Sequence, residues 1–152
     1  MSDAGDSRRQ DERRFWLYVL DVHAEIYGRL NRAMKAETDI SVTKFDALAQ
    51  LYRYPDGLTM SALSEALRVT NGNVSGLVAR LEKDGLAERT MSEQDRRSFT
   101  ARLTPEGRER FERALAVHDR VLSHCLDPLT EPDLAEALGS LRRLNAGLKI
   151  TG

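Results

Sequence analysis

The stretch that decides the fold is "VTNGNVSGLVARLEKDGLAER", which runs from Val69 to Arg89. Its middle carries apolar side chains at the spacing of one helix face: Val74, Leu77, Val78 and Leu81. Its beginning is small and polar instead, with Asn71, Gly72, Asn73, Ser75 and Gly76. A helix that only packs against a core does not need a first turn so free of bulk. We therefore expect a helix, capped by Thr70, whose narrow N-terminal end approaches another molecule.

The residue types of this first turn suit the major groove of DNA. An Asn side chain can bond N6 and N7 of adenine together, and Ser can bond several base edges. Gly72 and Gly76 let the backbone come close to the sugar–phosphate wall, and free N–H groups of a first turn favour phosphate. Arg80 lies one turn beyond Gly76 and is placed to reach a phosphate or a guanine. The alternative is a helix end that is merely solvated, and the neighbouring elements favour the DNA interpretation.

Two helices precede this stretch. The segment at 60–67, "MSALSEAL", can be capped by Thr59, and "RVT" then turns the chain into the next helix. Before it, the segment at 40–57, "ISVTKFDALAQLYRYPDG", predicts a helix with Ser41 as N-cap and Pro55 at its end. A short helix, a three-residue turn and a second helix are typical of a helix-turn-helix.

The apolar period changes to two after Gly85, which suits a left-handed helix C-cap. "LAERT" at 86–90 and "SFTARLT" at 98–104 alternate and predict a β-hairpin. The tip of the polar loop between them carries Asp95, Arg96 and Arg97. An arginine at the tip of a thin ribbon can enter a narrow minor groove, where the negative potential is deepest. For the loop taken alone, a solvated charge run is the alternative.

Longer helices flank this central part. Apolar residues recur at helical spacing from Asp11 to about Ala36, over a face wide enough to be buried on two sides. Residues 1–10 are polar and predict a flexible tail. "TPEG" starts a further helix at Pro105, and a last, leucine-rich helix opens at Thr130.

Length and composition narrow the class of protein. The 152 residues suffice for one domain with a substantial core, and the 41% of hydrophobic residues is usual for a soluble, folded chain. No apolar run approaches the roughly 20 residues that cross a bilayer, and the N-terminus has no apolar segment like that of a signal peptide. We therefore expect a cytoplasmic protein with no membrane segment. The net charge of −1 is mild evidence against DNA binding, because DNA-binding domains are often basic.

No pattern of catalytic or metal-binding residues stands out. There is no nucleophile–base pair and no phosphate-binding loop, so we expect no enzyme, no catalytic residue and no cofactor. His118, His124 and Cys125 do not share a helix face at metal-binding spacing, so we expect no metal. Cys125 is the only cysteine, which excludes an intramolecular disulfide, and its apolar neighbours predict a small buried side chain.

The combination "LSEALRVTNGNVSGLVARLEKDGLAERTMSEQDRRSFTARLTPEG" resembles the MarR family of bacterial transcription regulators. The likeness extends from about Asp11 to Leu148. It implies a mainly α fold with a minor β part, built around a winged helix-turn-helix. A DNA-binding lobe would span 41–104, and a helical dimerisation region would span 11–40 and 105–152.

The resemblance implies an obligate homodimer on double-stranded DNA. Asp95 would pair with Arg97 to stiffen the wing, which leaves Arg96 to enter the minor groove. A two-fold dimer predicts a pseudo-palindromic operator with half-sites ~10 bp apart. The residues expected at the major groove are Thr70, Asn71, Gly72, Asn73, Ser75, Gly76 and Arg80.

The resemblance also implies a small aromatic or carboxylate effector, bound between the dimer helices and the DNA lobe, that releases the operator. The residues placed to line such a pocket are Trp16, His23, Tyr27, Phe45 and Tyr52. Aromatic side chains at helical spacing are more often plain core. The leading hypothesis is thus a ligand-responsive repressor. The alternative is a winged-helix protein–protein interaction module without DNA binding, which the near-neutral charge favours and which predicts no salt-dependent affinity for DNA.

Overall fold

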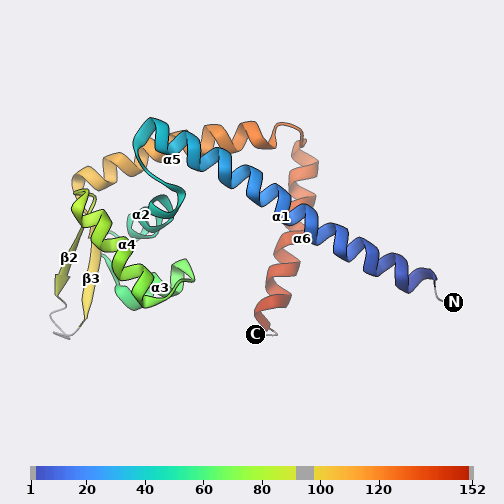
Figure 1. Ribbon diagram of the computed structural model, residues 1–152, viewed down its shortest axis with the longest axis horizontal. Coiled ribbons are helices and arrows are strands. Elements are labelled where there is room, and N and C mark those ends of the chain that lie inside the picture. The colour runs from blue at the N-terminus through green and yellow to red at the C-terminus, as the bar shows by residue number, and fades with distance from the viewer. Residues whose placement is uncertain (1–2, 92–97, 151–152) are drawn as a thin grey trace. The chain divides into compact units, whose positions relative to one another are not determined.

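The computed structural model describes residues 3–91 and 98–150. It is mainly helical with a small antiparallel sheet, as predicted (Figure 1). The chain divides into two compact units, one ending at Val121 and one beginning at Leu122. The elements, in chain order, are α1 (Asp3–Thr38), α2 (Val42–Arg53), β1 (Leu58–Thr59), α3 (Met60–Leu67), α4 (Asn71–Lys83), β2 (Ala87–Met91), β3 (Phe99–Leu103), α5 (Pro105–Leu126) and α6 (Glu131–Ile150).

The three predicted N-caps of the central helices are confirmed. Ser41, Thr59 and Thr70 each have an extended backbone, and each side-chain oxygen accepts a hydrogen bond from the N–H three residues further on. The donor–acceptor distances are 3.2, 3.1 and 3.3 Å. Each cap satisfies one of the N–H groups that a first helical turn leaves unpaired, which contributes about 1 kcal/mol to stability. Local chemistry therefore sets where α2, α3 and α4 begin.

One face of α4 belongs to the core of the first unit. The four apolar residues predicted to share that face are all buried, and α4 packs on α3 and β2. Burying side chains of this size gives about 1.5–3 kcal/mol each. This packing fixes which face of α4 remains outside. The buried residues are Val74, Leu77, Val78 and Leu81.

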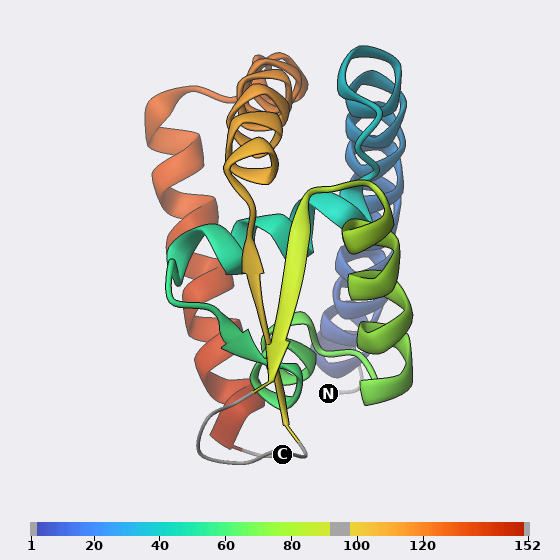
Figure 2. The ribbon, with the colours of Figure 1, turned by 90° about the vertical axis from the view of Figure 1, so that its left-hand side faces the viewer.

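The sheet has three antiparallel strands in the order β1-β3-β2 (Figure 2). The hairpin of β2 and β3 was predicted, but β1 was not, because a strand of two residues leaves no alternating pattern. Gly57 explains how β1 can pair. Its φ is +96°, and a Cβ there would lie 2.7 Å from the carbonyl oxygen of Ala101. Only glycine allows the chain to turn so close to β3.

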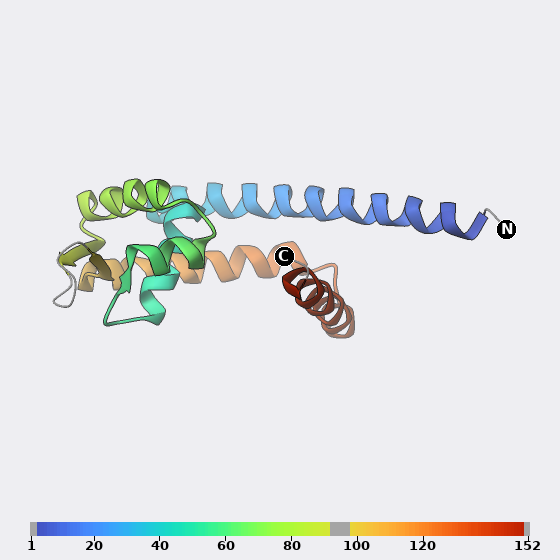
Figure 3. The same cartoon turned by 90° about the horizontal axis from the view of Figure 1, so that it is seen from below.

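Helix α1 differs from the expectation at its start. It begins at Asp3, so residues 3–10 are helical and do not form the predicted flexible tail. Polar composition suggested a tail, but the segment contains no proline, and Arg8 bonds Glu12 one turn later at 2.8 Å. The first half of α1 extends well beyond the other helices of its unit (Figure 3). Its large apolar side chains there are exposed.

The second unit consists of the end of α5 and helix α6. Thr130 and Asp133 cap α6 reciprocally: the Thr130 hydroxyl accepts from the Asp133 N–H, and the Asp133 carboxylate accepts from Thr130. Those hydrogen bonds lower the pKa of Asp133. Cys125, expected to be buried, is partly exposed. No helix within the described ranges is long and apolar enough to cross a membrane.

Candidate nucleic-acid interface

The first turn and a half of α4, residues 71–76, form what we call the open end of the helix. Asn71, Asn73 and Ser75 are exposed. A Cβ added to Gly72 would meet no atom within 4 Å, and one added to Gly76 would meet only the Arg80 guanidinium, at 3.7 Å. Packing within this chain therefore does not require glycine at either position. Since glycine in a helix costs about 0.5–1 kcal/mol relative to alanine, its presence suits an approach by another molecule.

The exposed side of α4 also carries positive charge. By helical spacing, Gly72, Gly76 and Lys83 lie opposite the buried face, and Arg80 lies beside them. Arg80 and Lys83 are exposed. In the described part of the chain, neither forms an ion pair. Both cations are thus available to an anionic partner.

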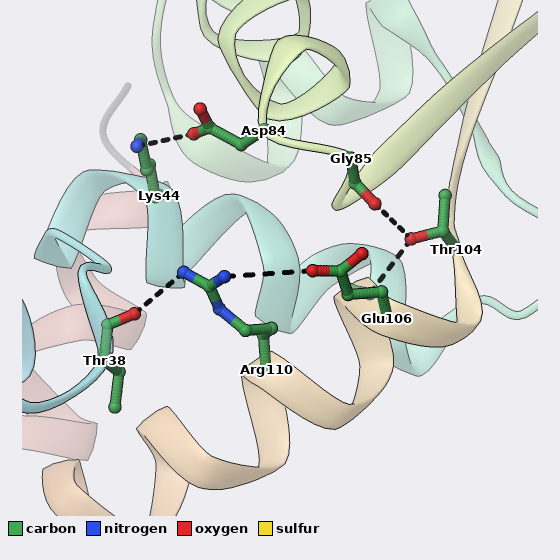
Figure 4. Close-up of polar contacts among 8 residues, drawn as sticks. Thr38, Lys44, Asp84, Gly85, Thr104, Glu106 and Arg110 are labelled. Carbon is green, nitrogen blue, oxygen red and sulfur yellow. Dashed lines mark hydrogen bonds and ion pairs between the residues drawn. The ribbon is translucent and has the colours of Figure 1, made fainter.

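The other end of α4 is held from three directions, and we call residues 84–86 the clamped end. Lys44 of α2 reaches Asp84 with a distance of 2.7 Å between Nζ and Oδ2 (Figure 4). The Thr104 hydroxyl donates to the carbonyl of Gly85 at 2.6 Å. It also accepts from the N–H of Gly107 at 2.9 Å, which caps α5 at its predicted start. Gly85 has a φ of +74°, which confirms the predicted left-handed cap.

Gly107 of α5 makes the closest contact with the clamped end. A Cβ on this residue would lie 1.8 Å from the carbonyl oxygen of Leu86, so α5 and the end of α4 touch through backbone atoms. Deeper in the unit, Arg110 of α5 donates to the carbonyl of Thr38 at 3.0 Å and pairs with Glu106 at 3.9 Å (Figure 4). The end of α4 is therefore fixed to α2 and α5, and α5 is in turn bonded to α1.

The hairpin follows directly from the clamped end. The predicted wing tip, with Asp95, Arg96 and Arg97, lies outside the described residues. Below the tip, Arg89 of β2 pairs with Glu82 of α4, with 2.8 Å between Nε and Oε2. A second pair, Arg102 and Glu88, joins β3 to β2 at 2.6 Å. These pairs neutralise acidic side chains that would otherwise repel DNA.

Ion pairs within the lobe explain how a chain with a net charge of −1 can still bind DNA. The acidic residues Glu82, Asp84 and Glu88 are each bonded to a cation of the lobe. Arg68 and Arg80, in contrast, are exposed and without an ion pair among the described residues. A near-neutral chain can thus present local positive charge, because the field at a surface depends on which charges are compensated.

Arg68 is a further exposed cation of the helix-turn-helix that the sequence did not single out. It ends α3 with a left-handed backbone, φ +55°, at a position where glycine is the usual residue. A non-glycine residue there carries backbone strain of order 1 kcal/mol or more. The sequence did carry a signal for Arg68. The turn after Leu67 must end one helix before the next begins at its Thr70 cap, and it contains no glycine to take the left-handed position. The exposed arginine lies in the turn between the two helices of the helix-turn-helix.

The five residues expected to line a ligand pocket fall into two groups. Trp16, His23 and Tyr27 are exposed on α1, where the rings of His23 and Tyr27 lie 5.8 Å apart.

Phe45 and Tyr52 of α2 belong instead to an aromatic cluster with α5. Phe45 stacks on Phe111 at 5.2 Å and on His118 at 4.8 Å between ring centroids. The Tyr52 hydroxyl donates to Glu112 at 3.0 Å, and Arg108 lies over its ring at 4.6 Å. A common pocket for the two groups stays a prediction.

Comparison with known proteins places this geometry among regulators of transcription. A model of the MarR family matches residues 38–98. A crystal structure of a MarR family transcriptional regulator from Silicibacter pomeroyi is 44% identical, with a TM-score of 0.80 over 93% of this chain and 97% of that one. Sco3205, a MarR family regulator from Streptomyces coelicolor solved in complex with DNA, is 25% identical, with a TM-score of 0.81 over 90% of this chain and 86% of that one.

A curated relative shows the same kind of protein. An uncharacterized helix-turn-helix-type transcriptional regulator of Bacillus cereus is 39% identical over 100 residues, which make up 66% of this chain. The match spans 65% of the length of that relative.

Proposed function

The chain belongs to the MarR family of transcriptional regulators, and on that premise we propose that it is a DNA-binding repressor acting as a homodimer at a pseudo-palindromic operator. The family and its relatives are regulators and not enzymes. The observation that carries the proposal is the open end of α4. Its exposed Asn and Ser side chains and its glycines have no role in the packing of this chain. They suit base edges and a close sugar–phosphate backbone.

The similarity to Sco3205, which was solved in complex with DNA, supports the same interface. In a helix-turn-helix the second helix lies in the major groove with its N-terminal residues at the base edges. Here that helix is α4, with Thr70, Asn71 and Asn73 at its start. For the wing, the proposal keeps the predicted roles: Arg96 enters the minor groove, and Asp95 pairs with Arg97 to stiffen the hairpin tip.

Exposed apolar surface supports the homodimer. Four consecutive large apolar residues of α1 are each more than half exposed, and consecutive residues point to all sides of a helix: Phe15, Trp16, Leu17 and Tyr18. On α6, Leu138, Leu141 and Leu144 are exposed as well. Such large apolar patches mark interaction surfaces. A second copy of the chain would cover them, and light scattering at micromolar concentration measures the resulting mass.

Release by a small ligand completes the proposal. A ligand that binds the non-DNA conformer more tightly lowers operator affinity in proportion to that preference. The exposed aromatics Trp16, His23 and Tyr27 and the cluster around Phe45 and Tyr52 are the surfaces proposed to take a phenolic or carboxylate compound. A thermal-shift screen of aromatic acids and their thioesters identifies compounds that stabilise the folded chain.

The central test measures binding to a duplex from the chain's own promoter region over a range of salt concentrations. A DNA-binding regulator loses affinity steeply with salt, because bound phosphates release counterions. The alternative function, a protein–protein interaction module, predicts no salt-dependent affinity for the duplex. Such a result would refute the proposal.

The wing is tested by Arg96→Ala, with Arg113→Ala as the control. Arg113 is an exposed arginine of α5 outside the proposed interface. We expect Arg96→Ala to weaken operator binding about 10-fold or more, since an arginine in a narrow minor groove is strongly attracted there. Equal affinities of the two variants would remove the wing from the proposed interface.

A further inference from the structure

One side chain, Arg89, joins the two elements that the proposed function brings to DNA. Its backbone N–H donates to Oε1 of Glu82 at 3.1 Å, and its Nε lies 2.8 Å from Oε2 of the same carboxylate. Both oxygens of Glu82 are thus bonded to a single residue. Glu82 lies in the last turn of α4, and Arg89 lies in the middle of β2.

The same arginine also contacts the other strand of the hairpin. Its guanidinium carbon lies 5.7 Å from the centroid of the Phe99 ring on β3. Arg89 is paired with Ala101 in the strand register, so Phe99 is its diagonal neighbour on the same face. A guanidinium at this distance is attracted to the ring face. Arg89 therefore bonds α4 on one side and contacts β3 on the other.

The position of Glu82 within α4 does not favour a carboxylate. A carboxylate in the last turn of a helix meets the negative end of the helix dipole, which is unfavourable. The side chains of Glu82 and Arg89 are 28% and 34% exposed, so solvent screens this pair less than it screens an open surface pair. Two bonds from one residue, one from its backbone and one from its side chain, also restrict rotation of the carboxylate more than a single contact does.

We propose that Glu82 and Arg89 are positioning residues that set the angle between the β2–β3 hairpin and α4, so that both reach their grooves of the same duplex together. This inference rests on the proposed DNA-binding function. The hairpin leaves α4 through a connection of only three residues, Asp84 to Leu86, and β2 packs on α4, so this pair is the polar contact between two elements that already touch. A small rotation at that point moves the far end of the ribbon out of its groove.

The molecule provides a matched control for this pair. Glu88 and Arg102 form an ion pair of 2.6 Å between the same residue types, and they are partners in the strand register. This pair joins β2 to β3 within the hairpin and has no bond to α4. It therefore shares the charges of the Glu82–Arg89 pair and lies in the same hairpin, but it lacks the connection to the helix.

Substitution of the two glutamates makes opposite predictions for charge and for positioning. Glu82→Gln removes a negative charge near DNA, so electrostatics alone predicts tighter binding. Positioning predicts weaker binding, by about 10-fold, because the ion pair that orients the hairpin is lost. Glu88→Gln removes the same charge from the control pair, and we expect its affinity to stay within about 2-fold of the unsubstituted chain or to rise.

Arginine-to-lysine changes keep the charge and test the geometry. Arg89→Lys loses Nε and the planar guanidinium, so we expect operator affinity to fall several-fold. Arg102→Lys is the control, and we expect no comparable loss. The salt slope adds a readout that lower stability does not change. A hairpin that misses its groove releases fewer counterions, so the slope of Glu82→Gln becomes shallower by about one or two phosphate contacts.

Fluorescence anisotropy with the promoter duplex measures all four variants, and thermal melting confirms that each is folded. Glu82→Gln binding as tightly as the unsubstituted chain, or more tightly, would overturn the inference. So would an equal loss in Glu88→Gln, because the effect would then belong to the hairpin in general. If the unsubstituted chain shows no salt-dependent binding, the proposed function itself fails, and this outcome is distinct from the other two.

Discussion

The two ends of α4 differ in what surrounds them. At the open end, residues 71–76, an added side chain at Gly72 would meet nothing within 4 Å. At the clamped end, residues 84–86, atoms of α2 and α5 hold the chain through Lys44 and Thr104. A helix that reads DNA needs both conditions, because a fixed root sets its direction and an empty tip permits approach. The same residue type, glycine, serves opposite purposes at the two ends.

The largest effect is expected at the clamped end, from Gly107→Ala. The new Cβ would lie 1.8 Å from the Leu86 carbonyl oxygen, and both partners are backbone, so α5 or the end of α4 must shift. We expect a loss of about 3 kcal/mol in the free energy of unfolding, at the upper end of overpacking costs. Denaturation by urea measures this loss. Gly139→Ala in α6 is the control, since its Cβ would meet only the end of the Arg143 side chain at 3.7 Å. A Gly107→Ala variant as stable as the unsubstituted chain would contradict the close contact.

The next effect is expected at the open end, from Gly76→Ala, which should raise stability and lower operator affinity. Stability should rise by about 0.5–1 kcal/mol, because alanine is the better helix former and the new methyl group meets only the Arg80 side chain. Operator affinity should fall about 10-fold, because that methyl group occupies space needed by DNA. Urea denaturation and anisotropy on the same sample measure the two quantities. A variant that gains stability and keeps its affinity would show that the open end does not face DNA.

The open end was predictable from the sequence because everything that forms it is local. Thr70 caps a helix that begins at the next residue, and the buried face of α4 repeats within eight residues. Periodicity and capping act over one or two turns, so a single sequence carries their signal. The left-handed Gly85 was predictable for the same reason.

The clamped end was predictable only in part. The motif "LTPEG" predicted the start of α5, but the reason for its glycine is a contact with Leu86, which lies 21 residues earlier. Strand β1 was missed because its partner, Ala101, is more than 40 residues away and the strand itself has two residues. Contacts of this kind depend on how helices and strands pack, and no periodic pattern in the sequence predicts them.

For α1 the sequence prediction was wrong about the N-terminal segment. Polar composition predicted a flexible tail at residues 1–10, but α1 begins at Asp3. Composition measures whether a segment can bury apolar surface, and a helix that continues outward from an apolar stretch does not need to bury its own polar turns. Arg8 and Glu12 stabilise this part locally.

The smallest effect concerns Asp46 of α2, the helix whose Lys44 bonds Asp84 at the clamped end. Partial burial of this carboxyl raises its pKa above 3.8, and the nearby His118 opposes the rise. A pKa raised by folding means that the native state favours the protonated acid. The contribution to stability is therefore full below the unfolded value and is lost as the pH rises through the folded pKa. At neutral pH the charged Asp46 is a small cost, which Asp46→Asn removes.

We expect Asp46→Asn to stabilise the fold by less than about 1 kcal/mol at pH 7, because the residue is largely exposed and solvent screens the effect. The gain should shrink as the pH is lowered towards 4, where the acid becomes protonated and resembles the amide. Urea denaturation of both chains at pH 7 and pH 4 measures the difference. Asp56→Asn, an exposed position in the turn after α2, is the control for the chemical change from acid to amide. A gain that grows on acidification would show that attraction to His118, and not burial, dominates at Asp46.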